Sequence, residues 1–272
     1  MNRVDIYLDK LESESIYIIR EAYWLYRDNL ALLWSCGKDS TALLHLLRKA
    51  FFGVIPFPVI HLDTTFKFKE IYDFRNRYSR EWGLDLIVAK NQEALKKGIS
   101  PDKGRDICCT ALKTETLKQA IKKYRFKALL LAIRRDEHSI RAKERYFSPR
   151  DRDSKWDYFD QPLEMWDQFY RQKDRDETHL RVHPMLGWRE IDIWRYIKRE
   201  KLPVIDLYFA RKNKRYRSIG CECCCQPVTS KANTIDKIIK ELEDTDIAER
   251  SGRTQDKEKP FMMQKLRSLG YM

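Results

Sequence analysis

The sequence lacks any stretch of about 18 uncharged apolar residues, the length that a membrane-spanning helix needs. Its amino-terminal stretch carries Asp5 and Asp9 and has no apolar run of the kind found in secretory signal peptides. We therefore expect no membrane contact and a cytoplasmic location. No internal repeat is visible, and the Walker A pattern GxxxxGK followed by serine or threonine is also absent. A repeat array and the Walker A class of phosphate loop are thereby excluded.

An excess of positive charge is present. Lysine and arginine number 54 against 41 aspartates and glutamates, which gives a formal net charge of +13. The arginines cluster at 134–152 and 211–217, where they alternate with acidic residues. Small polyanionic ligands therefore explain the charge about as well as a nucleic acid does. With 272 residues and 43% apolar content, the chain can bury one large domain, or one domain with an appendage.

A polar turn, Ser35-Cys-Gly-Lys-Asp-Ser40, separates a short apolar run from a helical pattern. Residues 31–34 predict a strand, and the leucines of 43–47 predict a helix that starts directly after Ser40. Such a turn directs backbone N–H groups and the positive end of a helix dipole at one point, which suits a polyphosphate. A simple helix N-cap that contains lysine is the alternative. The residues predicted to bind ATP here are Ser35, Gly37, Lys38, Asp39 and Ser40.

Strand-like and helix-like segments alternate along the chain. Strands are predicted at 31–34, 57–63, 84–90, 127–134 and just before Pro184, and helices at 9–27, after Ser40 and at 67–82, 112–124, 191–197 and 235–242. This alternation predicts an α/β fold with a parallel sheet flanked by helices and with ligands at the carboxyl ends of the strands. Residues 139–178 have little periodicity and are expected to form a long, partly ordered loop. The end of the chain is expected to be a polar tail.

The Ser35–Ser40 turn resembles the SxGKDS loop of the ATP pyrophosphatase (PP-loop) superfamily, whose members cleave ATP between the α and β phosphates. Segments 56–64, 134–145, 188–197 and 249–253 extend the resemblance, nearly end to end, to the small ATP-binding subunit of the heteromeric sulfate adenylyltransferase. The resemblance implies an adenine-nucleotide α-hydrolase-like fold and the formation of adenylyl sulfate and pyrophosphate from ATP and sulfate. It also implies Mg²⁺ as a cofactor and a GTPase large subunit as a partner.

Several charged residues are candidates for this chemistry. Asp63 ends the second strand at the same sheet edge as the loop, which suits a contact to the nucleotide or its Mg²⁺; an N-cap is the alternative. Arg134 and Arg135 end the fourth strand, and a guanidinium group matches a tetrahedral oxyanion; surface ion pairing is the alternative. We predict catalytic roles for these three residues and for Lys38.

A basic segment follows the paired arginines. Arg141, Lys143 and Arg145 alternate along the chain, so they would share one face of an extended loop. We predict that Arg141 and Arg145 contact the nucleotide, its pyrophosphate or sulfate. A solvated loop is the alternative.

The seven cysteines are unevenly spaced in a chain without a secretory signal, so disulfides are not expected. Cys108-Cys109 and the segment 220–225, which begins Gly-Cys-Glu-Cys-Cys, reproduce the paired-Cys plus GCxxC spacing of adenylyl-sulfate reductases that hold a four-iron cluster. The resemblance implies a 4Fe–4S cluster on Cys108, Cys109, Cys221 and Cys224. Zinc on the same ligands and unligated thiols are the alternatives, and the neighbouring Cys223 and Cys225 leave the choice of ligands open.

No cysteine follows Cys225, whereas the reductases attack the sulfonucleotide with a cysteine near the carboxyl terminus. A sulfonucleotide reductase therefore ranks below adenylyl transfer. An ATP pyrophosphatase of nucleic-acid thiolation or phosphorothioation also ranks below it, as does a non-enzymatic nucleotide sensor. We predict a PP-loop ATP-binding domain over residues 1–210, followed by a Cys-rich, cluster-bearing and partner-binding segment over residues 211–272.

Overall fold

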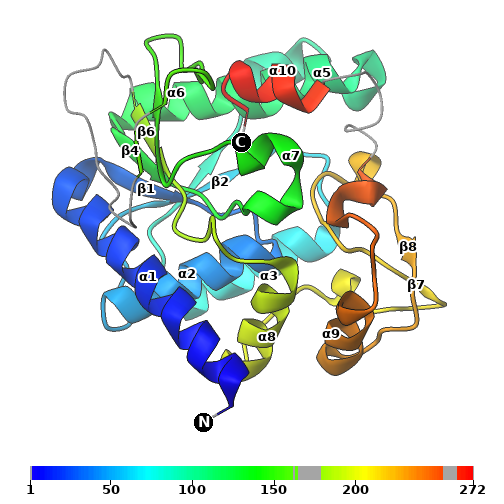
Figure 1. The fold of residues 1–272 in the computed structure, drawn as a ribbon. Helices are drawn as coiled ribbons and strands as arrows, with labels where there is room; N and C mark the ends of the chain where they lie inside the picture. The colour runs from blue at the N-terminus through cyan, green and yellow to red at the C-terminus, as the bar shows by residue number, and fades with distance from the viewer. Residues whose placement is uncertain (1, 162, 165–178, 254–261, 272) are drawn as a thin grey trace.

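The computed structural model describes residues 2–161, 163–164, 179–253 and 262–271 (Figure 1). Its centre is a six-stranded sheet in the order β3-β2-β1-β4-β6-β5. Neighbouring strands of this sheet run parallel, except that β5 is antiparallel to β6. The predicted α/β fold is therefore confirmed, with one antiparallel strand added at the edge. The strands are β1 (Leu30–Leu33), β2 (Val59–Leu62), β3 (Leu86–Ala89), β4 (Ala128–Leu130), β5 (Phe147–Arg150) and β6 (His179–Val182).

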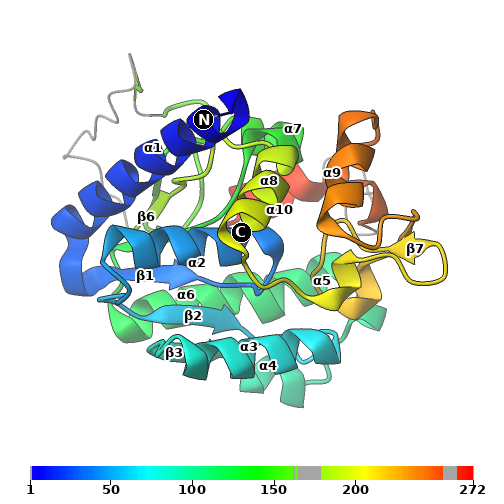
Figure 2. The same cartoon turned by 90° about the horizontal axis from the view of Figure 1, so that it is seen from below.

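Helices cover both faces of the sheet (Figure 2). Side chains of α1, α2, α3 and α8 share one hydrophobic cluster with the sheet, and side chains of α6 share another. No helix in the described ranges is long and apolar enough to span a bilayer. The helices are α1 (Arg3–Tyr26), α2 (Lys38–Ala50), α3 (Lys69–Glu81), α4 (Gln92–Lys96), α5 (Arg105–Cys109), α6 (Glu115–Tyr124), α7 (Ser139–Ala142), α8 (Glu190–Glu200), α9 (Ile235–Glu243) and α10 (Met262–Ser268).

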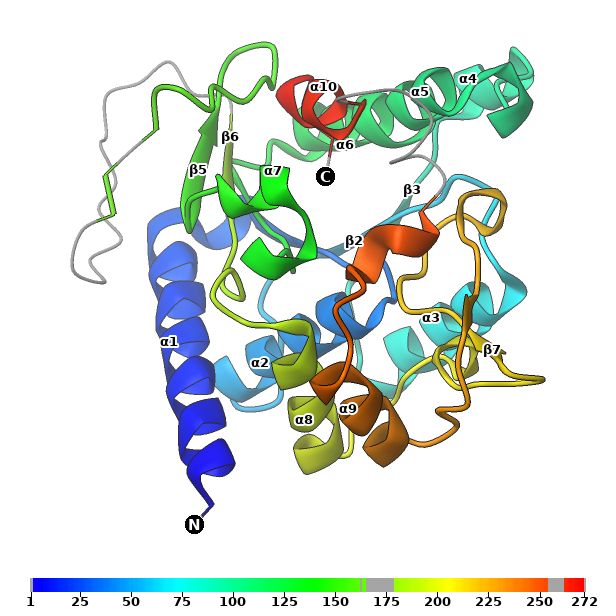
Figure 3. The ribbon, with the colours of Figure 1, turned by 45° about the vertical axis from the view of Figure 1, so that its right-hand side comes forward.

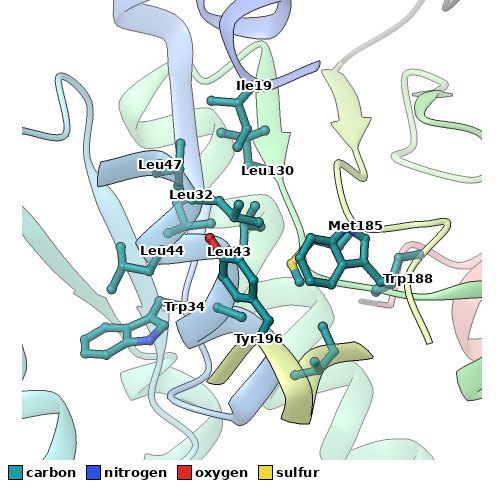
Figure 4. Packing of buried hydrophobic residues seen from close by; sticks show 14 of the residues in the cluster. Ile19, Leu32, Trp34, Leu43, Leu44, Leu47, Leu130, Met185, Trp188 and Tyr196 are labelled. Atoms are coloured by element: carbon teal, nitrogen blue, oxygen red, sulfur yellow. The ribbon is translucent and has the colours of Figure 1, made fainter. Parts of the chain in front are cut away.

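The two clusters follow from the alternation of side chains along a strand. Leu30 and Leu32 of β1 face the cluster that contains α2, and Ala31 and Leu33 face the cluster that contains α6. Figure 4 shows Leu32 packed among leucines of α2, with Tyr196 of α8 nearby. Complete burial of one such leucine contributes about 1.5–3 kcal/mol. This packing holds the carboxyl end of β1 and the amino end of α2 in fixed positions.

Two sequence-based expectations about irregular regions are wrong. The region expected to be a loop at 139–178 contains α7 and β5, although its residues 162 and 165–178 lie outside the described ranges. The expected polar tail contains α10, whose Arg267 is fully buried. Both elements, β5 and α10, combine a buried ion pair with apolar packing. Arg150 of β5 and Arg267 of α10 pair with the buried Glu144, while Phe147 and Leu266 belong to hydrophobic clusters. Each element is too short for its hydrophobic periodicity to be detected in the sequence.

Other boundaries shift by a few residues. Helix α1 starts at Arg3 rather than near residue 9, because the side chain of Asn2 accepts a hydrogen bond from Val4 N and caps the helix. The segment after 211 forms the hairpin of β7 (Lys214–Arg215) and β8 (Val228–Thr229), followed by α9. Its Ile238 belongs to the same hydrophobic cluster as Leu43 of α2. The division at residue 210 stays a prediction.

Candidate active site

The turn between β1 and α2 has the predicted strand–turn–helix geometry. Cys36 adopts a left-handed backbone conformation with φ of 66°, and Gly37 is the N-cap of α2. The backbone N–H of Lys38 donates to the hydroxyl of Tyr208 at 2.9 Å. A Cβ on Gly37 would lie 3.3 Å from that hydroxyl and 3.4 Å from Ser35 Oγ, so a larger residue would crowd the turn. The positive end of α2 is therefore fixed by a side chain distant in sequence.

A closed ring of ion pairs surrounds the start of α2. Lys38 Nζ and the Arg134 guanidinium both bond to the carboxylates of Asp39 and Glu249, with 3.1 Å between Lys38 Nζ and Asp39 Oδ2. Lys38 is 1% exposed and Arg134 is fully buried. Burial opposes the charge of Arg134, but Glu249 and nearby acids raise its pKa further above its ordinary value. Two cations, from the segments that follow β1 and β4, thus converge on one point, as the sequence predicted, although β4 itself ends at Leu130 rather than at Arg134.

A second group of charges lies beside this ring. Glu137 accepts hydrogen bonds from Arg141 and from Arg250, whose NH1 is 3.3 Å from Glu137 Oε1. Burial alone would raise the pKa of Glu137, but the neighbouring Arg141 and Arg250 hold it well below its usual range. Arg141 is therefore buried and paired at the site rather than solvated on a loop.

A cavity of about 150 Å³ opens at the carboxyl ends of the strands, next to the turn. Lys113 and Tyr271 form part of its wall, and Lys113 Nζ donates to the Tyr271 hydroxyl at 3.2 Å. Lys113 lies on a single π-helical turn, Thr110–Thr114, a feature frequent at functional sites. Sequence reasoning missed both residues, because neither carries a motif or a periodic signal. The polar lining is completed by Ser35, Gly37, Lys38, Asp39, Ser40, Lys67, Glu137, Arg141, Tyr208, Ser218, Gly220, Arg250 and Arg253.

Four predicted nucleotide-site residues are not among the residues that line this cavity in the described chain, namely Asp63, Arg134, Arg135 and Arg145. Arg134 nevertheless bonds to Asp39 of the cavity wall, whereas the other three have different partners. The carboxylate of Asp63 accepts a hydrogen bond from the hydroxyl of Tyr72 at 3.0 Å. The guanidinium carbon of Arg135 lies 5.1 Å from the ring centre of Tyr146. The carbonyl oxygen of Arg145 accepts a hydrogen bond from a buried histidine ring at 2.8 Å. Their roles in catalysis or binding stay predictions, and Arg134 is the member of the arginine pair that reaches the turn.

The two cysteine patches come together in space. Arg105, at the start of α5, donates to the Cys223 carbonyl oxygen at 3.3 Å, which ties the helix of Cys108 and Cys109 to the turn of Cys221 and Cys224. All four of these thiols are buried. Burial and the neighbouring thiols raise the pKa of Cys108 to about 12. The described residues nevertheless contain no group of three or more potential ligands in a metal-binding arrangement.

Positive side chains surround Cys221. Burial tends to raise its pKa, but Lys113 and Lys67 outweigh that effect and lower it. Thr64 Oγ1 lies 3.2 Å from the Cys221 sulfur. Four buried thiols beside these cations suit the donor chemistry of a negatively charged iron–sulfur or zinc thiolate site. By contrast, burial raises the pKa of Cys36, in the turn, to about 12 and keeps it an inert thiol.

The family model described as "Phosphoadenosine phosphosulfate reductase domain" matches residues 29–227. A Geotalea uraniireducens protein named sulfate adenylyltransferase subunit 2 is 40% identical over 100% of both chains. The chain belongs to the sulfate adenylyltransferase subunit 2 family. A second relative of that name, from Saccharophagus degradans, is 40% identical over 97% of both chains. The match to this family runs end to end, so it also covers the segment of Glu249, which lies beyond the reductase-domain match.

One solved structure has a fold similar to that of this subunit 2 family member. FMN adenylyltransferase of Candida glabrata in complex with ATP matches with a TM-score of 0.58, covering 83% of this chain and 65% of that chain. The sequence identity is 16%, so the likeness concerns the fold alone.

Proposed function

We propose that this chain is the catalytic, ATP-binding subunit of a sulfate adenylyltransferase, forming adenylyl sulfate and pyrophosphate from ATP and sulfate. The observation that carries the proposal is the convergence of Lys38 and Arg134 on the amino end of α2, in a chain related end to end to subunit 2 proteins. We further propose that it acts in the cytoplasm with a GTPase large subunit as its partner.

The chemistry requires positioning and charge neutralisation more than covalent catalysis. Sulfate is a poor nucleophile, so the enzyme must hold it in line with the α phosphate and stabilise the charge that develops on pyrophosphate. Lys38, Arg134 and the N–H groups at the start of α2 supply positive potential there. Asp39 lies on the cavity wall and would hold Mg²⁺ once it exchanges a bond to Lys38 or Arg134 for the metal, which prefers oxygen ligands and would screen the phosphates.

The decisive experiment is exchange of labelled pyrophosphate into ATP. We expect exchange that depends on sulfate and is strengthened by the large subunit. Arg134→Ala should lower the rate of this exchange more than Arg135→Ala does. Arg134 bonds to Asp39 of the turn, whereas the contact described for Arg135 is with the ring of Tyr146. Exchange that ignored sulfate but required tRNA or DNA would instead favour nucleic-acid thiolation. Release of orthophosphate in place of pyrophosphate would contradict the PP-loop assignment.

We also propose that Cys108, Cys109, Cys221 and Cys224 hold a 4Fe–4S cluster. The support is the burial and proximity of the four thiols and the cations beside Cys221. A cluster there would serve a structural or electrostatic role, since adenylyl transfer from ATP to sulfate moves no electrons.

Protein purified without oxygen should be brown and contain about four irons per chain. Cys221→Ser is expected to lose this iron, because it removes one of the four proposed thiolate ligands. Cys223→Ser is the matched control and should retain it, since Cys223 is the exposed thiol of the same turn. Iron content and the visible absorption spectrum measure both outcomes. A colourless protein holding one zinc would contradict the cluster and support a zinc site.

A further inference from the structure

The carboxylate of Glu249 neutralises positive charge that a bound phosphate would need. It bonds to Lys38 on one side and to Arg134 on the other, while Asp39 bonds to the same two cations. Burial tends to raise the pKa of Glu249, but Arg134 and Lys38 outweigh that effect and lower it to about 2. The carboxylate is therefore ionised at neutral pH. Two cations and two anions cancel, so the ring as it stands has no net charge with which to attract a phosphate.

The space beside the ring is also too small for the nucleotide. The cavity measures about 150 Å³, whereas pockets for small-molecule ligands are typically about 300–1,000 Å³. Arg250 and Arg253, from the same short segment as Glu249, form part of its wall. Figure 3 shows this segment in orange, after α9, between α7 and the β7–β8 hairpin. Movement of the segment would enlarge the cavity and remove one carboxylate from each of the two cations, which would keep their bonds to Asp39.

Contacts of Arg253 show what holds the segment in place. Its guanidinium donates to the Ile219 carbonyl oxygen at 2.8 Å, to Cys225 Sγ at 2.9 Å and to Ser218 Oγ at 3.1 Å. A Cβ on Gly220 would lie 2.3 Å from Arg253 NH1, so the absence of a side chain at Gly220 makes room for this guanidinium. Glu249, Arg250 and Arg253 thus attach the segment through polar contacts, which a competing anion can exchange.

We propose that Glu249 occupies the position of a substrate oxyanion, and that binding of pyrophosphate or the ATP polyphosphate to Lys38 and Arg134 displaces Glu249 together with residues 249–253. The inference rests on the proposed function only in taking the turn to be a polyphosphate site. It assigns Glu249 to the control of substrate binding rather than to the transfer step.

The first test measures the affinity for inorganic pyrophosphate by calorimetry in the presence of EDTA, so that no metal bridges the ligand to a carboxylate. Glu249→Gln leaves Lys38 and Arg134 short of one buried counter-charge, which the ligand can replace. We expect binding at least about tenfold tighter than in the unmodified chain. Glu249→Asp retains the charge and should bind more weakly than Glu249→Gln. Unchanged or weaker binding by Glu249→Gln would overturn the proposal.

A matched control is Glu243→Gln, which removes a carboxylate from the end of α9 that pairs with Arg195 at 2.7 Å. Its affinity for pyrophosphate should equal that of the unmodified chain, because neither Glu243 nor Arg195 is among the described residues that line the cavity. An equal gain in both variants would show a general charge effect and overturn the proposal.

The second test needs no variant and therefore holds even if Glu249→Gln fails to fold. Amide hydrogen exchange of the unmodified chain is followed with and without pyrophosphate. We expect faster exchange in residues 249–253 when pyrophosphate is bound, with slower exchange at the start of α2. Unchanged or slower exchange in 249–253 would show that Glu249 stays in place and overturn the inference. If labelled pyrophosphate failed to enter ATP in a sulfate-dependent way, only the proposed function would be overturned, because neither the calorimetry nor the amide hydrogen exchange uses sulfate.

Discussion

Replacing Lys38 by alanine is expected to lower the rate of sulfate-dependent pyrophosphate exchange by about 10²–10³, the usual effect of removing one transition-state contact. The buried ammonium group lies at the amino end of α2, where charge on the leaving pyrophosphate would develop. Initial rates at saturating ATP and sulfate measure the effect. Thermal unfolding shows whether the protein remains folded, and it should, because Glu249 keeps Arg134 as a partner.

Lys49→Ala is the matched control, since Lys49 lies near the other end of the same helix and pairs with Glu12 at 2.7 Å and Glu200 at 3.0 Å. Its exchange rate should stay within a factor of about two of the unmodified chain, because half-exposed ion pairs contribute little. A comparable loss in both variants would indicate damage to α2 as a whole. Full activity of Lys38→Ala would refute the role of Lys38.

The turn could be predicted from the sequence because its signals are local. An apolar strand, a polar turn with Gly37 and Lys38, and a helix with leucines at regular spacing occupy residues 31–47 without a gap. The parallel order of the strands followed from the alternation of strands and helices. The placement of Arg134 at the turn followed as well, because carboxyl ends of neighbouring parallel strands meet at one edge.

The remaining site residues could not be predicted, because their contacts join distant parts of the chain. Glu249 reaches Lys38 across 211 positions, and Tyr271 reaches Lys113 across 158. No periodicity reports such contacts. Arg135 does not line the cavity for a related reason. A short helix, Arg135–Glu137, begins directly after Arg134, and the Arg135 guanidinium lies over the ring of Tyr146 instead.

Outside the active site, the largest expected effect on stability comes from Glu144. Its carboxylate is fully buried and is the shared partner of Arg150, at 2.8 Å, and of Arg267 in α10. Arg181, also buried, donates to the carbonyl oxygen of Tyr271 at 2.7 Å. These contacts hold the carboxyl-terminal segment against the sheet. They therefore hold Tyr271 in the wall of the cavity.

Glu144→Gln is expected to destabilise the protein by about 3–5 kcal/mol, because it leaves two buried guanidinium groups without their counter-charge. Urea unfolding measures this loss, and Glu115→Gln is the control, since Glu115 makes a half-exposed pair with Lys118 that contributes about 0–1 kcal/mol. If α10 depends on Glu144, the KM for ATP should also rise as Tyr271 leaves the cavity wall. A variant as stable as the control would show that the buried arginines are balanced by other groups.

The pH dependence of unfolding is an independent measure of how much the ionised carboxylate of Glu144 stabilises the protein. Burial tends to raise the pKa of Glu144, but Arg150 and Arg267 outweigh that effect and hold it well below its usual range. The unfolded chain therefore takes up a proton near pH 4 to 5, before the folded protein does, so the stabilisation by Glu144 is complete above that range and declines as the pH falls. In Glu144→Gln the free energy of unfolding should fall less steeply as the pH decreases. The difference in slope from the unmodified chain is up to about 1.4 kcal/mol per pH unit. An identical pH profile in both proteins would contradict ion pairing of Glu144 as the force that docks α10.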